Sequence, residues 1–210
     1  MAITINGSGT ITGISAGGLP SGVVTDATLA STLDLTGKTV TLPSGVGGKI
    51  LQVARSQYGT ATTLSTPTRN QHYDLPFSVN ITPTSSTSLM LISFSIMGEV
   101  TSPWDLTASI SRTISGTRTV IQPTVSGHNG GIVVMPDSYG GETNNSSTPG
   151  QFSCAQFPDV NRPANTNQIT YAPTIANETN YTFYLNRTIF DSGTNCERAF
   201  SWITVMEVSE

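Results

Sequence analysis

GKTVTLPSGVGGKILQVA, residues Gly37 to Ala54, is the stretch at which the composition of this sequence changes. An alternating segment, Thr39–Leu42, runs into Pro43 and a glycine-rich joint, and an apolar run follows at Ile50–Ala54. Alternation of polar and apolar residues is typical of a β-strand, and proline beside clustered glycine is typical of a break. We interpret this stretch as a hinge between an extended stem, residues 1–48, and a compact β head, residues 49–210.

The composition of the 210-residue chain suits β structure. Charged residues make up 10% of it, whereas about 25% is usual, and the apolar fraction of 36% is also low. The surface is therefore built mainly from hydroxyl and amide groups. Thr and Val are favoured in strands, and Lys and Glu are not. The length accommodates one domain with an appendage.

Charge and hydropathy exclude several classes of partner. The net charge is −4 and the basic residues are scattered singly, whereas nucleic-acid binding requires clustered Lys and Arg to neutralise phosphates. No apolar run approaches the ~20 residues that cross a bilayer. Met1–Asn6 lacks the charged and apolar regions of a signal peptide. We therefore predict synthesis in a cytoplasm, no nucleic-acid partner and no membrane insertion.

Residues 1–48 are too poor in large side chains for one copy to bury a core. Gly recurs through the alternating segment Thr4–Ile14, and an isolated hairpin of this kind is marginal in water. Thr25–Leu33 has the pattern of a two-turn helix, too short to be stable alone. One interpretation of this region is a disordered leader. The other is a stem in which several copies wrap together and bury Ile11, Ile14, Leu29, Leu33 and Leu35.

The head carries short strand patterns separated by turn signals, with no helical pattern between them. These patterns predict an all-β antiparallel sandwich, most simply a jelly roll. Turns are predicted at Thr82–Ser86, Ser115–Thr117 and Asp191–Asn195. Strands are predicted at Phe77–Thr82, Leu89–Met97, Trp104–Ile110, Ile132–Met135, Gln151–Phe157, Gln168–Tyr171, Tyr181–Leu185 and Phe200–Val208.

Residues suited to catalysis are sparse. Neither histidine, His72 or His128, lies in a nucleophile elbow or a zinc-binding helix motif. Glycoside hydrolysis needs two acids across a cleft, and the loop acids Asp137, Glu142, Asp159 and Asp191 are interpreted instead as solvated. We predict no enzymatic activity, no metal and no cofactor.

The two cysteines, Cys154 and Cys196, fit no metal-ligand spacing. One interpretation is a disulfide, which requires that the protein works outside a cell. The alternative is a pair of small buried thiols.

The longest region without a strong strand pattern, Gln122–Gly150, is the predicted recognition surface, because long loops on a rigid β scaffold commonly carry binding residues. An aromatic ring that stacks on a sugar, beside amides and a carboxylate that bind hydroxyls, suits saccharide recognition. The alternative is a tolerant surface loop. The candidate residues are His128, Asn129, Asp137, Tyr139 and Asn144, with Arg162 from a second loop.

Segments of both halves resemble a known family. They are Thr10–Pro20 and Gly37–Pro43 in the stem, Gly48–Val53 at the boundary between stem and head, and Val79–Ser88, Tyr184–Thr188 and Ser201–Val208 in the head. With these segments, the chain resembles bacteriophage tail-fibre proteins, especially those of marine phages, with a globular tip after a thin stem. The resemblance covers the stem and most of the head, but not Gln122–Gly150.

This resemblance implies a homotrimeric protein of the virion tail. Its N-terminus would attach to another virion tail protein, and its tip would bind a host cell-surface receptor, a glycan or a protein. The resemblance carries over no catalytic residue. Two other functions stay open: a purely structural virion protein, such as a capsid decoration or tail connector, and a polysaccharide-degrading tail spike.

Overall fold

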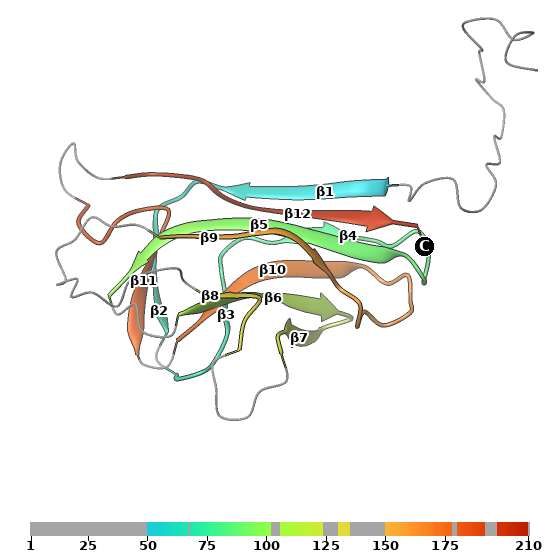
Figure 1. Ribbon diagram of the computed structural model, residues 1–210, viewed down its shortest axis with the longest axis horizontal. Helices are drawn as coiled ribbons and strands as arrows, with labels where there is room; N and C mark the ends of the chain where they lie inside the picture. The colour runs from blue at the N-terminus through green and yellow to red at the C-terminus, as the bar shows by residue number, and fades with distance from the viewer. Residues whose placement is uncertain are drawn as a thin grey trace, which may run out of the picture. The chain divides into compact units, whose positions relative to one another are not determined.

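The computed structural model describes residues 50–66, 68–101, 106–123, 130–134, 150–177, 180–191 and 197–209. These residues form two antiparallel sheets of six strands each, with no helix among them (Figure 1). The prediction of an all-β antiparallel head is confirmed. The predicted stem, with its short helix and its apolar residues, lies outside the described residues and stays a prediction.

The first sheet, sheet A, is built around the long strand β5. β12 pairs with Leu89–Ser95 of β5, β11 pairs with Gly98–Val100, and β9 runs along the other edge. β1 extends the sheet beside β12, and β2 extends it beside β11. The strands of sheet A are β1 (Ile50–Tyr58), β2 (Thr62–Thr66), β5 (Leu89–Val100), β9 (Gly150–Pro158), β11 (Tyr181–Leu185) and β12 (Ser201–Val208).

The second sheet, sheet B, has β6 and β10 at its centre. β3 and β4 pair with different parts of the remaining edge of β10, and β7 and β8 pair with the remaining edge of β6. Its strands are β3 (Tyr73–Asp74), β4 (Val79–Ile81), β6 (Thr107–Ile114), β7 (Thr117–Ile121), β8 (Val133–Val134) and β10 (Ile169–Ala176).

Alternating side chains place one apolar core between the sheets. In β12, Ile203 and Val205 are fully buried, and Thr204 between them is only half-buried. The same cluster contains Ile110 and Tyr171 from sheet B, so both sheets contribute to it. Because burial of apolar area drives folding, this shared cluster is what holds the two sheets together. The arrangement is sandwich-like.

The burial of side chains changes along strand β5. The continuous apolar run at the start of Leu89–Met97 is typical of a central strand buried on both faces. The structure has alternating burial up to Ser93, and only the segment Phe94–Val100 is buried on both faces. In that second half, Glu99 accepts a hydrogen bond of 2.6 Å from the backbone N–H of Ile189, so the chain after β11 covers it.

The predicted turn at Ser115–Thr117 is confirmed, and in the structure it is a hairpin turn that adds a strand that the patterns did not predict. Ser115 and Gly116 have φ values of 48° and 80°. Positive φ at both central residues is the property of a type I′ turn, whose twist matches that of the flanking strands. The turn therefore pairs β7 with β6. β2 and β3 were also not predicted, because they are short and have few apolar residues.

Strand β10 continues beyond its predicted end at Tyr171. Proline lacks the N–H that a strand interior needs, yet β10 runs through Pro173 to Ala176. β4 pairs with Ile169–Tyr171 and β3 pairs with Thr174 and Ile175, so Pro173 lies between the two ladders. Its carbonyl accepts from the N–H of Leu75 at 2.8 Å. No ladder hydrogen bond is lost at this position.

Candidate functional site

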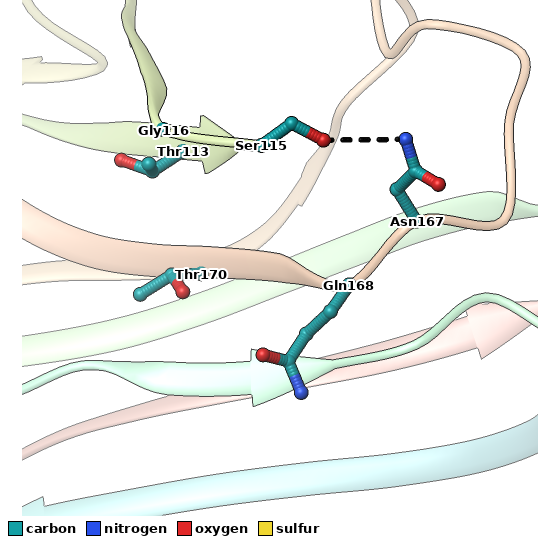
Figure 2. A pocket seen from close by; sticks show the side chains of 6 residues that line it. All are labelled: Thr113, Ser115, Gly116, Asn167, Gln168 and Thr170. Carbon is teal, nitrogen blue, oxygen red and sulfur yellow. Dashed lines mark hydrogen bonds between the residues drawn. The ribbon is translucent and has the colours of Figure 1, made fainter.

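A polar groove lies where β6 turns into β7 and the loop before β10 approaches that turn (Figure 2). Its volume is about 440 Å³, and it is open to solvent. Strand register places Thr113 opposite Thr170, and the Ser115–Gly116 turn closes one end. The residues that line it are Thr113, Ser115, Gly116, Asn167, Gln168 and Thr170.

Side-chain hydrogen bonds hold the groove walls in place. The Asn167 amide donates to the Ser115 hydroxyl at 3.3 Å, which joins the loop before β10 to the β6–β7 turn. The Thr170 hydroxyl donates to the Asn80 amide oxygen at 2.7 Å, which ties the floor to β4. In Figure 2, Gln168 points away from the Asn167–Ser115 hydrogen bond. Its amide is exposed to solvent.

The lining determines which ligands the groove suits. All its polar side chains are hydroxyls or carboxamides, which both donate and accept hydrogen bonds. Such a surface matches a neutral polyhydroxylated ligand such as a sugar. The lining contains no ionisable side chain to act as a general acid or base. It also contains no aromatic ring, so the stacking platform predicted for a saccharide site is not part of this groove.

The structure places only one of the predicted receptor-binding residues. His128, Asn129, Asp137, Tyr139 and Asn144 lie outside the described residues. Arg162 is half-buried in the loop after β9, where its guanidinium donates to the carbonyls of Ser88 at 2.7 Å and Asn165 at 2.8 Å.

Through these bonds Arg162 supports the groove indirectly. The side-chain oxygen of Asn165 accepts from the N–H of Asn167 at 3.1 Å, and Asn167 lines the groove. Arg162 therefore fixes the loop that presents Asn167, and that loop is anchored on the 84–88 segment as well. The lining residues themselves were not predicted from the sequence. The only signals were the Ser115–Gly116 turn and the amide pair Asn167–Gln168 before a strand.

The interpretation of the loop acids as solvated is wrong for Asp159. Its side chain is 1% exposed and forms a buried ion pair with Arg112, with N–O distances of 2.6 and 2.8 Å. The Tyr171 hydroxyl donates to the same carboxylate at 2.8 Å. Burial, together with the neighbouring Asp159 charge, raises the pKa of Tyr171. Arg112 and Tyr171 both donate hydrogen bonds to Asp159. We therefore assign these three side chains a structural role in the protein interior.

Asp191 is the second described loop acid, and it pairs with two arginines. Arg187 donates to it at 2.7 Å, and Arg198 forms a second ion pair with it. The hydrogen bond from Arg187 is the main reason that the pKa of Asp191 is lowered. Arg187 also lies 4.5 Å from the ring centroid of Tyr184. This cluster links β11 to the segment that leads into β12.

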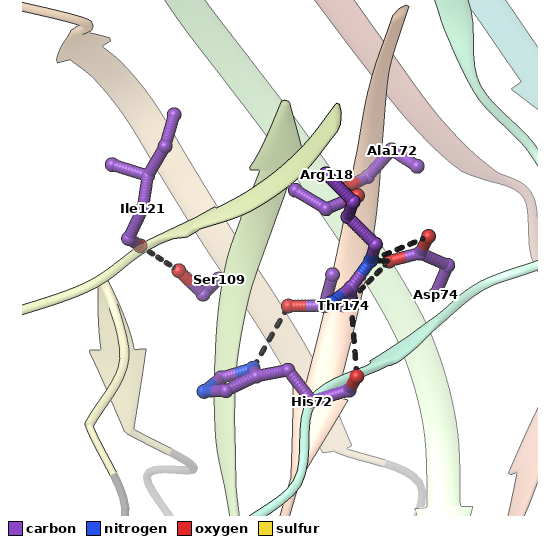
Figure 3. Close-up of polar contacts among 8 residues, drawn as sticks. His72, Asp74, Ser109, Arg118, Ile121, Ala172 and Thr174 are labelled. Carbon is purple, nitrogen blue, oxygen red and sulfur yellow. Dashed lines mark hydrogen bonds and ion pairs between the residues drawn. The ribbon is translucent and has the colours of Figure 1, made fainter. Parts of the chain in front are cut away.

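His72 is a buried structural histidine (Figure 3). Its Nε2 lies 2.6 Å from the Gly130 carbonyl, which only accepts, so Nε2 carries the proton. Its Nδ1 then accepts from the Thr174 hydroxyl at 2.9 Å. Burial is the main reason that the pKa of His72 is lowered. The neutral ring joins β10 to the segment before β8.

Above this histidine, Arg118 crosses sheet B to reach Asp74 (Figure 3). The guanidinium donates to the Asp74 carboxylate at 2.7 Å and to the His72 carbonyl at 3.0 Å. Both side chains are more than a third exposed, so the pair adds little stability. It links β7 to β3 across the two central strands of sheet B.

Cys154, on β9, is a free, half-buried thiol whose pKa is raised by burial. Cys196 lies outside the described residues. Within the described ranges, no group of three or more His, Cys, Asp or Glu side chains is arranged to hold a metal ion. No helix in that part of the chain is long and apolar enough to cross a membrane.

No protein-family model matches this chain, and no curated protein matches it either.

Proposed function

We propose that this protein is a bacteriophage tail-fibre protein whose head binds a host cell-surface glycan during adsorption. The observation that carries the proposal is the open groove of about 440 Å³, because its lining offers only hydroxyls, carboxamides and a glycine. Sugar hydroxyls form hydrogen bonds with such groups without having to desolvate a charge. Thr113 and Thr170 of the groove lie on paired strands, and Ser115 and Gly116 lie on a tight turn, so this part of the lining is held in place before a ligand binds.

The assembly in this proposal is a homotrimer. Residues 1–48 form the shared stem and attach to another virion tail protein, and residues 49–210 form a jelly-roll-like head. The location is the virion tail. Three shallow sites on one particle act together, since a linked second site binds at high effective concentration. Weak binding to each single glycan is therefore sufficient for stable attachment to a cell.

The test is attachment of the fluorescently labelled full-length protein to a panel of bacterial cells. Gln168→Ala removes an exposed groove amide, and Gln156→Ala removes an exposed amide from β9 as a matched control. We expect the parent and the control to bind some strain equally. We expect attachment of Gln168→Ala to fall by about tenfold, since the loss of roughly 1 kcal/mol per site is amplified over three sites.

Other outcomes identify the competing functions. Attachment to no strain would favour a structural virion protein. Release of new reducing ends from host capsule would show a polysaccharide-degrading spike. Strong attachment that Gln168→Ala does not change would place recognition outside the groove, and Tyr139→Ala, in the predicted loop region, is then the variant to compare.

A further inference from the structure

Sheet A has an apolar patch on the face that points away from the core. In β12, Ile203 and Val205 point into the core, so Met206 and Val208 lie on the opposite face. Cross-strand pairing extends each of them into a row: Met206 lies between Val53 and Leu91, and Val208 lies between Ile50 and Leu89. Paired residues of antiparallel strands share a face, so each row is continuous.

The outer apolar patch, as we call it, consists of Ile50, Val53, Leu89, Leu91, Pro158, Met206 and Val208. Pro158 belongs to it because β9 pairs it with Leu91. Ile50 is 54% exposed and Val53 is 58% exposed. The next row along the strands, Arg55–Thr204–Ser93, is polar and bounds the patch. A rimmed apolar area of this kind is typical of a protein–protein contact.

We propose that the outer apolar patch packs against a second copy of this chain, so that neighbouring heads contact each other through sheet A. This inference rests on the homotrimer of the proposed function. The chain enters the head at Ile50, and Ile50 is itself part of the patch. If the preceding residues of several copies form a shared stem, that stem is connected to each head at this patch, which favours contact between the patches of neighbouring copies.

The absence of charge from the patch permits contact with another copy of the same chain. Every copy carries a net charge of −4, so contact through most surfaces brings like charges together, which is unfavourable. None of the patch residues is ionisable. Contact through the patch removes apolar area from water and avoids that repulsion.

Thiol labelling of the full-length chain tests the contact independently of the stem. In a Cys154→Ser, Cys196→Ser background, Val53→Cys places a thiol in the patch. Gln57→Cys is the matched control, because it lies on the same strand and face but outside the patch, opposite Trp202. Both positions are exposed in the single chain. Maleimide should therefore label Cys at 53 about tenfold more slowly than Cys at 57 if copies cover the patch.

A charge substitution provides the second measurement. Val53→Glu, with Gln57→Glu as control, should shift the dissociation of the assembly to higher protein concentration by about tenfold, since it buries an unpaired charge. Equal labelling rates, or equal dissociation of the two Glu variants, would overturn the inference while leaving a trimeric parent intact. A monomeric parent that still attaches to cells would refute the contact and the trimer but not the receptor-binding function.

Discussion

Glu207 is a fully buried carboxylate on β12 that accepts hydrogen bonds from two directions. One oxygen accepts from the Gln52 amide at 2.6 Å, and the other accepts from the Thr84 N–H at 2.7 Å and the Thr84 hydroxyl at 2.9 Å. Burial alone would raise the pKa, but the donors of Gln52 and the 84–88 segment outweigh it and lower the pKa of Glu207 to about 2. The carboxylate thus fastens the β4–β5 connection to the last strand.

The first prediction is that this carboxylate makes the head sensitive to acid. Its pKa is lower in the folded protein than its ordinary value of 4.5, so its stabilisation is complete above that value and is lost as the pH falls toward 2. Glu207→Gln should lower the unfolding free energy at pH 7 by on the order of 1–3 kcal/mol. Urea unfolding between pH 3 and 7 checks this. Parallel stability curves for variant and parent would contradict it.

A second prediction concerns the buried ion pair of Asp159 and Arg112. Asp159→Asn leaves the Arg112 charge without its partner, so it should destabilise the head by about 3–5 kcal/mol. Tyr171→Phe removes only one hydrogen bond to the same carboxylate and should cost about 1 kcal/mol. Denaturant midpoints of the two variants provide the measurement. A cost for Asp159→Asn as small as that for Tyr171→Phe would show that the arginine finds another partner.

At the scale of elements, the β6–β7 hairpin connects stability to the groove. Its turn requires positive φ at Ser115 and Gly116, and both residues also line the groove. A side chain at Gly116 would point into open space, so substitution there acts through backbone conformation rather than through a clash.

The third prediction follows from that distinction. Gly116→Val should destabilise the head by about 1–3 kcal/mol, because a β-branched residue is strained at positive φ. Gly116→Asn is the matched control, since Asn tolerates this conformation. Thermal unfolding and cell attachment should both suffer in the Val variant and stay near the parent in the Asn variant. Equal effects of Val and Asn would show that the turn does not keep its positive φ.

At the scale of the whole molecule, the fourth prediction is a trimer. Light scattering coupled to size exclusion should give about three times 22.1 kDa. Leu29→Asp with Leu33→Asp should weaken the assembly, because each change buries an unpaired charge in a predicted apolar seam. The melting of the head should stay unchanged. A parent with the mass of one chain would refute the trimer.

Much of the fold was predictable because its signals are local. In β11 and β12, alternation of large apolar and polar residues reveals which face is buried, since successive side chains point to opposite faces of a strand. Ser115-Gly116 indicated a tight turn for a similar reason, because few residues tolerate positive φ. Neither inference required knowledge of which strands pair with each other. The low charge and the wealth of hydroxyls and amides likewise anticipated a neutral polar surface.

Tertiary structure alone decided which distant residues meet. Thr113 and Thr170 share the groove because β6 and β10 pair in one particular register, and register depends on long-range packing rather than on local pattern. Asp159 follows a strand and looks like any loop acid, yet Arg112 and Tyr171 on the other sheet make it an interior anion. β10 passes through Pro173 because its neighbouring strand is divided there. The sequence by itself determined that the head is antiparallel β structure and where most of its strands lie, and the packing of the two sheets determined where the groove and the buried charges lie.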